Sequence, residues 1–244
     1  MLQRETAMTA TLTGKALQLL PHADDAMRCA EHARSIGVDP AGTSIAADAV
    51  ILVEIPRPWP KPVFGHGLLL GLSSMMELHC GQARILAAEP RGDVSAVRAT
   101  IFERREVGMV GSVFDCAGQD ALADLMAQLQ TRFPSEVTGH QSAAVAPDLA
   151  VLVCTQGSHD ICCGSDGVRF AVDLERAAPG LALYRVSHTG GHRFAPTAMT
   201  LPDGRMWASL STEGALSILD LTGDAAMAAP TCRGWWGAPT GPGQ

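Results

Sequence analysis

The chain has 244 residues, a formal net charge of −7, 47% hydrophobic residues and 18% charged residues. This composition is typical of a soluble globular protein with one large domain or two smaller ones. The excess of negative charge argues against a surface that binds nucleic acid or an anionic membrane. No apolar run approaches the roughly 18 residues that a membrane span needs. We therefore expect neither a nucleic-acid partner nor a membrane partner.

The cysteines and the N-terminal segment indicate the compartment. The chain contains seven cysteines, an odd number, and three of them lie close together at positions 154, 162 and 163. This pattern suits a reducing compartment and a metal site better than a disulfide framework. Residues 1–20 lack a compact apolar core before a small-residue cleavage site, so we expect no secretory signal. We predict a cytoplasmic protein.

The first half of the chain predicts an N-terminal domain over residues 23–134, after a poorly ordered lead-in at 1–22. Apolar periodicity and turn residues predict its elements. In chain order these are a helix at 23–36, a strand at 50–55, a helix at 67–78, strands at 83–88, 95–104 and 109–114, and a helix around 122–129 that ends by Pro134. A turn at 91–93 joins two of the strands. Residues 135–147, rich in Ser, Ala, Gly and Pro, predict a linker.

The second half predicts a C-terminal domain over residues 148–234, followed by a Pro/Gly tail at 235–244. Its elements are a strand at 149–153, a helix at 168–178, strands at 181–186, 197–201 and 205–210, and a helix at 212–221 with Thr212 as its expected cap. Both halves follow the order strand, helix, strand, strand, strand, helix, although they share no detectable sequence identity. Thioredoxin-like domains use this order. The predicted fold class is α/β, with two thioredoxin-like domains in tandem.

Cysteines and histidines follow two consecutive predicted strands of the second half. Cys154 and Cys163 lie in the loop after the first strand, and His188 and His192 lie in the loop after the second. Thiolate sulfur and imidazole nitrogen are soft and borderline metal ligands. Because loops at the same edge of an α/β sheet converge, these four side chains can meet. The sequence therefore predicts a metal site at this edge.

The spacing of the cysteines bears on the kind of metal. Eight residues separate Cys154 from Cys163, whereas structural zinc sites usually space their first cysteine pair by about two to four residues. Two thiolates on one iron and two imidazoles on the other are the ligand types of a Rieske 2Fe–2S cluster. We favour the cluster over zinc. Cys162 is expected to be buried packing, because neighbouring side chains of an extended loop point in opposite directions.

The chain resembles the sucrase/ferredoxin-like family at two motifs. Residues 152–163 read LVCTQGSHDICC and residues 187–195 read SHTGGHRFA. The family pattern is a cysteine, eight residues, a second cysteine, a variable interval and His-x-Gly-Gly-His. Weaker matches extend the resemblance over roughly residues 29–234, at positions 40–43, 53–54, 58–59, 201–204 and 233–234. The chain departs from the family where Ser158 and His159 replace a usually basic residue.

The resemblance implies a 2Fe–2S cluster, ligated by Cys154, Cys163, His188 and His192, in a thioredoxin-like domain that transfers electrons. The expected partner is a redox protein of unknown identity. Reduction should be coupled to protonation, because a metal-bound imidazole keeps a titratable proton on its other nitrogen. We expect an intermediate to high reduction potential.

Two other function classes stay open. The first is an iron–sulfur or thiol-dependent oxidoreductase, for which Cys162 is the nearest candidate thiol. The second, less favoured, is a zinc-binding structural or interaction protein. Glycoside hydrolysis, which the family name suggests, needs a pair of carboxylates, and no acidic pair is placed for it. We expect a redox carrier more than a catalyst, and no sucrase.

Several other residues have structural interpretations. Cys29, Cys80, Cys116 and Cys232 lack ligand spacing and are expected to be buried small apolar residues. Arg193 either neutralises the cluster, marks the docking face or forms a structural salt bridge. Trp59, in a Pro-rich loop, is expected to pack between the two domains.

Overall fold

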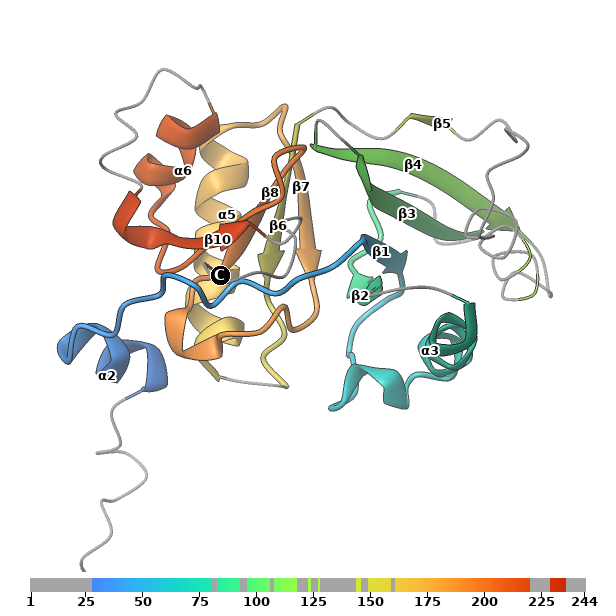
Figure 1. Cartoon of the computed structure of the whole chain (residues 1–244), viewed down its shortest axis with the longest axis horizontal. Coiled ribbons are helices and arrows are strands. Elements are labelled where there is room, and N and C mark those ends of the chain that lie inside the picture. Colours follow the sequence, from blue (N-terminus) through green and yellow to red (C-terminus); the bar gives the residue numbers. More distant parts are fainter. Residues whose placement is uncertain are drawn as a thin grey trace, which may run out of the picture.

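The structure is a computed structural model that describes residues 28–79, 83–92, 96–105, 108–117, 144–145, 149–158, 161–219 and 229–235, with 123 and 127 as single helical positions. These residues form a mixed α/β fold around one open sheet of ten strands, in the order β10-β9-β8-β6-β7-β2-β1-β3-β4-β5. Figure 1 shows the two halves of the chain side by side. The predicted α/β class is therefore confirmed at this level.

The elements of the first half are α2 (Cys29–Ser35), β1 (Ala49–Glu54), η1 (Val63–Gly65), α3 (Gly67–His79), β2 (Ala83–Ala88), β3 (Ala96–Arg105), β4 (Gly108–Ala117) and β5 (Ala144–Val145). Those of the second half are β6 (Ala150–Cys154), the π-helical turn η2 (Cys163–Gly167), α5 (Val168–Ala177), β7 (Ala182–Val186), η3 (His192–Phe194), β8 (Ala198–Leu201), β9 (Arg205–Trp207), α6 (Thr212–Leu219), η4 (Ala229–Thr231) and β10 (Cys232–Trp235).

Both halves of the sheet have the same strand order and orientation. In the first half β1 is parallel to β2 and antiparallel to β3, which pairs with β4. In the second half β6 is parallel to β7 and antiparallel to β8, which pairs with β9. A helix connects the parallel strands in each half, α3 in the first and α5 in the second. Each half thus places the carboxyl ends of two parallel strands at one edge.

The halves join through a short antiparallel contact between β2 and β7. Ala88 pairs with Val186, and backbone hydrogen bonds on either side run from the Ser187 N–H to the Ala87 carbonyl (2.8 Å) and from the Glu89 N–H to the Arg185 carbonyl (3.0 Å). These bonds flank the central pair symmetrically. The loops that follow β2 and β7 therefore begin at the same junction.

The core explains why β6 is apolar along its whole length and why β1 is apolar up to its last residue, Glu54. Every residue of both strands is buried, as expected for central strands with both faces covered. One core cluster draws on both halves and includes Leu52, Phe102, Leu152 and Tyr184. The rings of Phe102 and Tyr184 meet edge to face, with centroids 6.4 Å apart. The two halves share this apolar face.

Several predicted elements differ in detail from the structure. The strands β2 and β3 follow one another in sequence but are not neighbours, because β1 lies between them. Residues 144–145 of the predicted linker form β5, which pairs with the edge of β4. The cap of α6 is Ser211 instead of Thr212, since the Ser211 Oγ accepts a hydrogen bond from the Gly214 N–H at 3.0 Å. An N-cap side chain must lie just outside the helix to reach that donor.

Two apolar segments also pack differently from expectation. The sequence of residues 67–78 is apolar nearly all round and predicts a covered helix, yet in α3 Leu70 is 55% exposed while Leu69 and Leu72 are fully buried. Trp59 packs in the core of the first half instead of between domains, and its Nε1–H donates to the Ile55 carbonyl at 3.0 Å. Ile55 directly follows the last residue of β1, so the Pro-rich loop folds back on its own strand to make this bond.

Some predicted segments lie outside the described residues. They are the lead-in at 1–22, the first part (23–27) of the helix at 23–36, the helix at 122–129 apart from positions 123 and 127, most of the linker at 135–147 and the tail after Trp235. Among the described residues, no helix is both long enough and apolar enough to cross a membrane.

Candidate metal centre

The two motif loops start at the carboxyl ends of adjacent parallel strands. Strand β6 pairs with β7 in parallel, up to the pair Cys154 and Val186. Cys154 is the last residue of β6 and is 1% exposed, while His188 comes two residues after β7. The Thr155 N–H donates to the Val186 carbonyl at 3.0 Å and keeps the strands together just beyond the ladder. The predicted convergence of the two loops is confirmed.

The cysteine loop returns to the sheet through a close backbone approach. A Cβ atom on Gly164 would lie 2.5 Å from the Cα of Gly157, closer than a real Cβ contact. Only glycine at this position lets the two arms of the loop approach so closely. This approach brings Cys163, the first residue of η2, back toward the end of β6.

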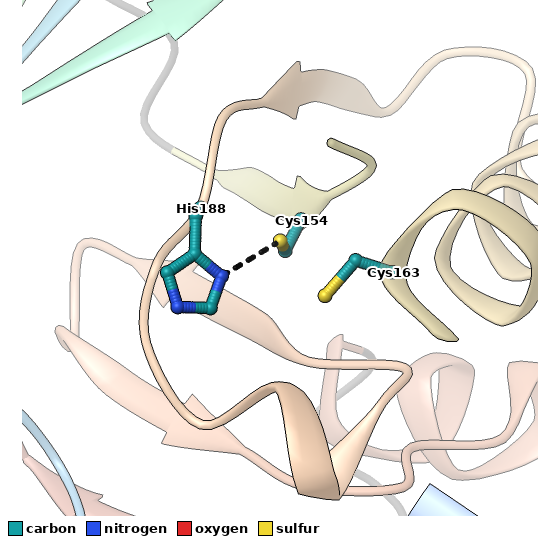
Figure 2. A group of neighbouring side chains, drawn as sticks. All are labelled: Cys154, Cys163 and His188. Atoms are coloured by element: carbon teal, nitrogen blue, oxygen red, sulfur yellow. Dashed lines mark hydrogen bonds between the residues drawn. The ribbon is translucent and has the colours of Figure 1, made fainter. Parts of the chain in front are cut away.

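Three of the four predicted ligands form one compact group of metal-ligating atoms. The Sγ atoms of Cys154 and Cys163 and a ring nitrogen of His188 all lie within 4.8 Å of one another. The Sγ of Cys154 lies 4.0 Å from the Nδ1 of His188. Figure 2 shows the three side chains pointing toward one another, with Cys163 approaching from the start of the helical segment. Both cysteines are buried and His188 is half-buried.

The fourth predicted ligand, His192, lies beside this group and not within it. Its ring centroid is 6.2 Å from that of His188, and the two rings are inclined at 52°. His192 is half-buried and opens the short helix η3. The two glycines between the histidines both have left-handed backbones, with φ of 87° at Gly190 and 73° at Gly191. Glycine adopts this conformation without steric cost, so the loop can turn both imidazoles to one side.

Cys162 is buried, but the geometric reason given from the sequence was wrong. Residues 161–162 are helical and lead directly into η2, so neighbouring side chains diverge around a helix axis and do not alternate as in an extended loop. Cys162 is fully buried and packs in a small cluster with Ala30, Cys154, Cys163 and Ala195. Helix α2 thus contributes Ala30 to the apolar wall behind the cysteines.

The surroundings of Cys154 favour its thiolate. A hydrogen bond from Cys163 is the largest cause that holds the pKa of the Cys154 thiol well below its usual value, and His188 and the backbone N–H groups of Thr189 and Gln156 act in the same direction. Burial opposes them. Because the thiolate is the form that binds metals, this environment prepares Cys154 as a ligand.

Gln156 is a residue of the site that sequence reasoning missed. It is 2% exposed. Its Oε1 accepts a hydrogen bond from the His188 N–H at 3.0 Å, and its Nε2 donates to the Pro60 carbonyl at 2.8 Å. The side chain therefore links the cysteine loop, the histidine loop and the Pro-rich loop of the first half. Nothing in the local sequence indicates these distant partners.

Arg233 is the second missed residue, although it lies in one of the weaker matches to the family pattern. It is on β10 and is 2% exposed. Its guanidinium donates to the Gly190 carbonyl at 3.1 Å, to the Thr43 Oγ1 at 3.1 Å and to the Thr43 carbonyl at 2.6 Å. Arg193, the arginine singled out from the sequence, is instead exposed. Its guanidinium lies 4.8 Å from the ring centroid of Phe194, and the ion pairs of the described residues do not include the salt bridge considered for it.

The remaining cysteines lie outside the donor group where they are described. Cys29 is exposed and Cys232 is half-buried, so the expectation that both are buried was wrong. Cys29 is the first residue of a short surface helix, and only one face of such a helix can be covered. Cys80, the Cys116 side chain, His159 and Asp160 lie outside the described residues.

The structure thus defines a mixed α/β protein with two buried sulfur donors and a half-buried imidazole at the ends of two parallel strands. The chain belongs to the sucrase/ferredoxin-like family, whose model matches residues 40–234. This match covers both halves of the sheet and both motif loops. No curated protein and no solved structure matches the chain.

Proposed function

We propose that this protein is an electron carrier with one 2Fe–2S cluster, ligated by Cys154, Cys163, His188 and His192. The observation that carries the proposal is the buried group of two sulfur atoms and one imidazole nitrogen within 4.8 Å of one another, with a second imidazole next to it. The family name, sucrase/ferredoxin-like, supports the same reading. When bound, the cluster would accept and release one electron at a time.

The donor chemistry of the described residues fits this cofactor. Two thiolates and two neutral imidazoles match the Rieske ligand types, and the environment of Cys154 favours its thiolate. Cys162, the candidate thiol of the alternative oxidoreductase, is fully buried. A reactive thiol needs access to its substrate, so the burial of Cys162 favours a carrier over a thiol-dependent enzyme.

The matching strand orders of the two halves support a further part of the proposal. We assign a thioredoxin-like scaffold domain to residues 23–134, a linker to 135–147, and a thioredoxin-like cluster domain to 148–234. The scaffold half contributes the Pro60 carbonyl that holds Gln156. The net charge of −7 suits docking to a basic redox protein in the cytoplasm.

Anaerobic purification followed by absorbance, iron and sulfide measurements tests the proposal. We expect a red-brown protein with two irons and two sulfides per chain, and with bands that bleach on dithionite. A colourless protein that holds zinc would refute it and favour the structural alternative.

In the coloured protein, the midpoint potential should fall as pH rises between about 6 and 10, because each imidazole ligand has a second titratable nitrogen. A flat profile would remove proton coupling from the proposal.

A further inference from the structure

A buried arginine supports the histidine loop from behind. Arg233 reaches the loop from β10, and its Nη1–H donates to the carbonyl of Gly190, between the two histidines. The fit is tight at the next residue, because a Cβ on Gly191 would lie 2.7 Å from Nη2 of Arg233. Two further donors of the guanidinium hold Thr43, in the segment between α2 and β1. The rigid fork of an arginine thus fixes the loop against two distant parts of the chain.

The charge of Arg233 has no carboxylate partner among the ion pairs of the described residues. Its guanidinium is almost completely buried, and a buried cation without a counter-charge is strongly destabilising. Burial lowers the pKa of Arg233 to about 10, Arg193 acts in the same direction, and the charge of Cys154 acts against both. Arg233 therefore stays a cation at neutral pH. The anionic group acting on it is a thiolate of the metal centre.

We propose that Arg233 is a positioning residue of the metal centre, which fixes the His188–His192 loop and offsets the negative charge that the site gains on reduction. This inference rests on the cluster proposed above. Two ferric ions and two sulfides carry a charge of about +2, and two thiolates with neutral imidazoles bring the site near zero. One electron from an external donor makes it about −1. Because a nearby buried cation stabilises the more negative state, Arg233 raises the reduction potential.

The experiment compares three variants of the full-length, cluster-loaded protein. Arg233→Gln removes the buried positive charge. Arg233→Lys keeps a positive charge but loses the planar guanidinium that donates several hydrogen bonds at once. Arg193→Gln removes an exposed charge from the same loop. We expect Arg233→Gln to disfavour the reduced form at least tenfold, which for one electron is a fall of about 59 mV in midpoint potential. Arg233→Lys should shift it less. Arg193→Gln should shift it least, because water and salt screen an exposed charge.

A second readout separates positioning from charge. The visible circular dichroism of the oxidised cluster reports its ligand geometry, and we expect it to change in both Arg233 variants and to be unchanged in Arg193→Gln. A cluster-bearing Arg233→Gln protein with the wild-type potential and spectrum would overturn the inference.

If Arg233→Gln does not assemble a cluster, the cluster content of Arg233→Lys decides whether the charge has the proposed role. A lysine variant without a cluster would then refute the role of the charge, and one with a cluster would support it. If the wild-type protein itself holds no cluster, the proposed function fails first, which distinguishes the two failures.

Discussion

The two halves of the sheet share a strand order, yet only one of them carries a group of metal-ligating side chains among the described residues. Glu54 ends β1 and pairs with Ala88 of β2, as Cys154 ends β6 and pairs with Val186 of β7. Glu54 and Cys154 thus hold equivalent places at the two parallel strand ends. The Glu54 carboxylate accepts a hydrogen bond from the Arg91 N–H at 2.9 Å. The equivalent strand end therefore closes a turn in one half and carries a candidate metal ligand in the other.

The topology thus gives each half an equivalent position at a parallel strand end, and the side chains at that position determine whether a metal site can form there. The loop after β1 is Pro-rich and packs Trp59 into its own core. In the loop after β6, the backbones of Gly157 and Gly164 approach closely, and Cys163 returns to the strand end. The first half nevertheless contributes to the centre, because Arg57 donates to the Thr155 carbonyl at 3.1 Å and Pro60 accepts from Gln156.

The largest effect should come from the strand-end cysteine. We expect Cys154→Ala to abolish the cluster, with complete loss of visible absorbance and iron, because it removes one of the two thiolates. Cys162→Ala is the matched control, since Cys162 is equally buried and close by but lies outside the donor group. It should retain the cluster. Equal loss of iron in the two variants would contradict the assignment of Cys154 and Cys163 as the thiolate ligands.

An intermediate effect should come from loss of the hydrogen bond between Gln156 and Pro60, which joins the two halves. Gln156→Leu leaves the His188 N–H and the Pro60 carbonyl without this partner, which should lower the free energy of unfolding by about 2–4 kcal/mol. It should also loosen the histidine loop and reduce the iron content. Urea denaturation and iron analysis measure the two effects. The matched control is Ser158→Ala, which removes the bond to the Trp59 carbonyl (2.9 Å) and a longer one from the Gln156 Nε2–H (3.3 Å). Because it leaves the bonds from Gln156 to His188 and Pro60 in place, it should cost about 1 kcal/mol without loss of iron. Wild-type iron retention in Gln156→Leu would show that the first half does not support the centre.

The smallest effect should come from the equivalent strand end of the first half. Glu54→Ala removes the acceptor of the Arg91 N–H, and we expect it to lower the free energy of unfolding by about 1–2 kcal/mol. The absorbance, the iron content and the midpoint potential should stay as in the wild type. Loss of the cluster in this variant would mean that the two strand ends are not as independent in function as their chemistry indicates.

Much of this architecture was predictable because its signals are local. The sequence predicts strands at 50–55, 83–88 and 181–186, and the bounds of each differ by at most one residue from those of an observed strand. Cys154 follows the predicted strand at 149–153 and His188 follows the one at 181–186, and these positions were sufficient to predict that the two side chains meet. Caps and edge strands were less predictable: Ser211 and Thr212 are both good cap residues, and β5 depends on a free edge of β4.

The sequence by itself determined the class of fold, the elements and the loops that carry the cysteine and histidine pairs, because period, spacing and strand ends are properties of neighbouring residues. Only the tertiary structure decided what surrounds them. The bonds from Arg233 to Thr43 join residues 190 positions apart, and the bond from Gln156 to Pro60 joins residues 96 positions apart. Such long-range contacts produce no periodic pattern in the sequence. They arise only when the sheet brings β10, the Pro-rich loop and both motif loops together, and there they bury a charge and an amide beside the candidate metal centre.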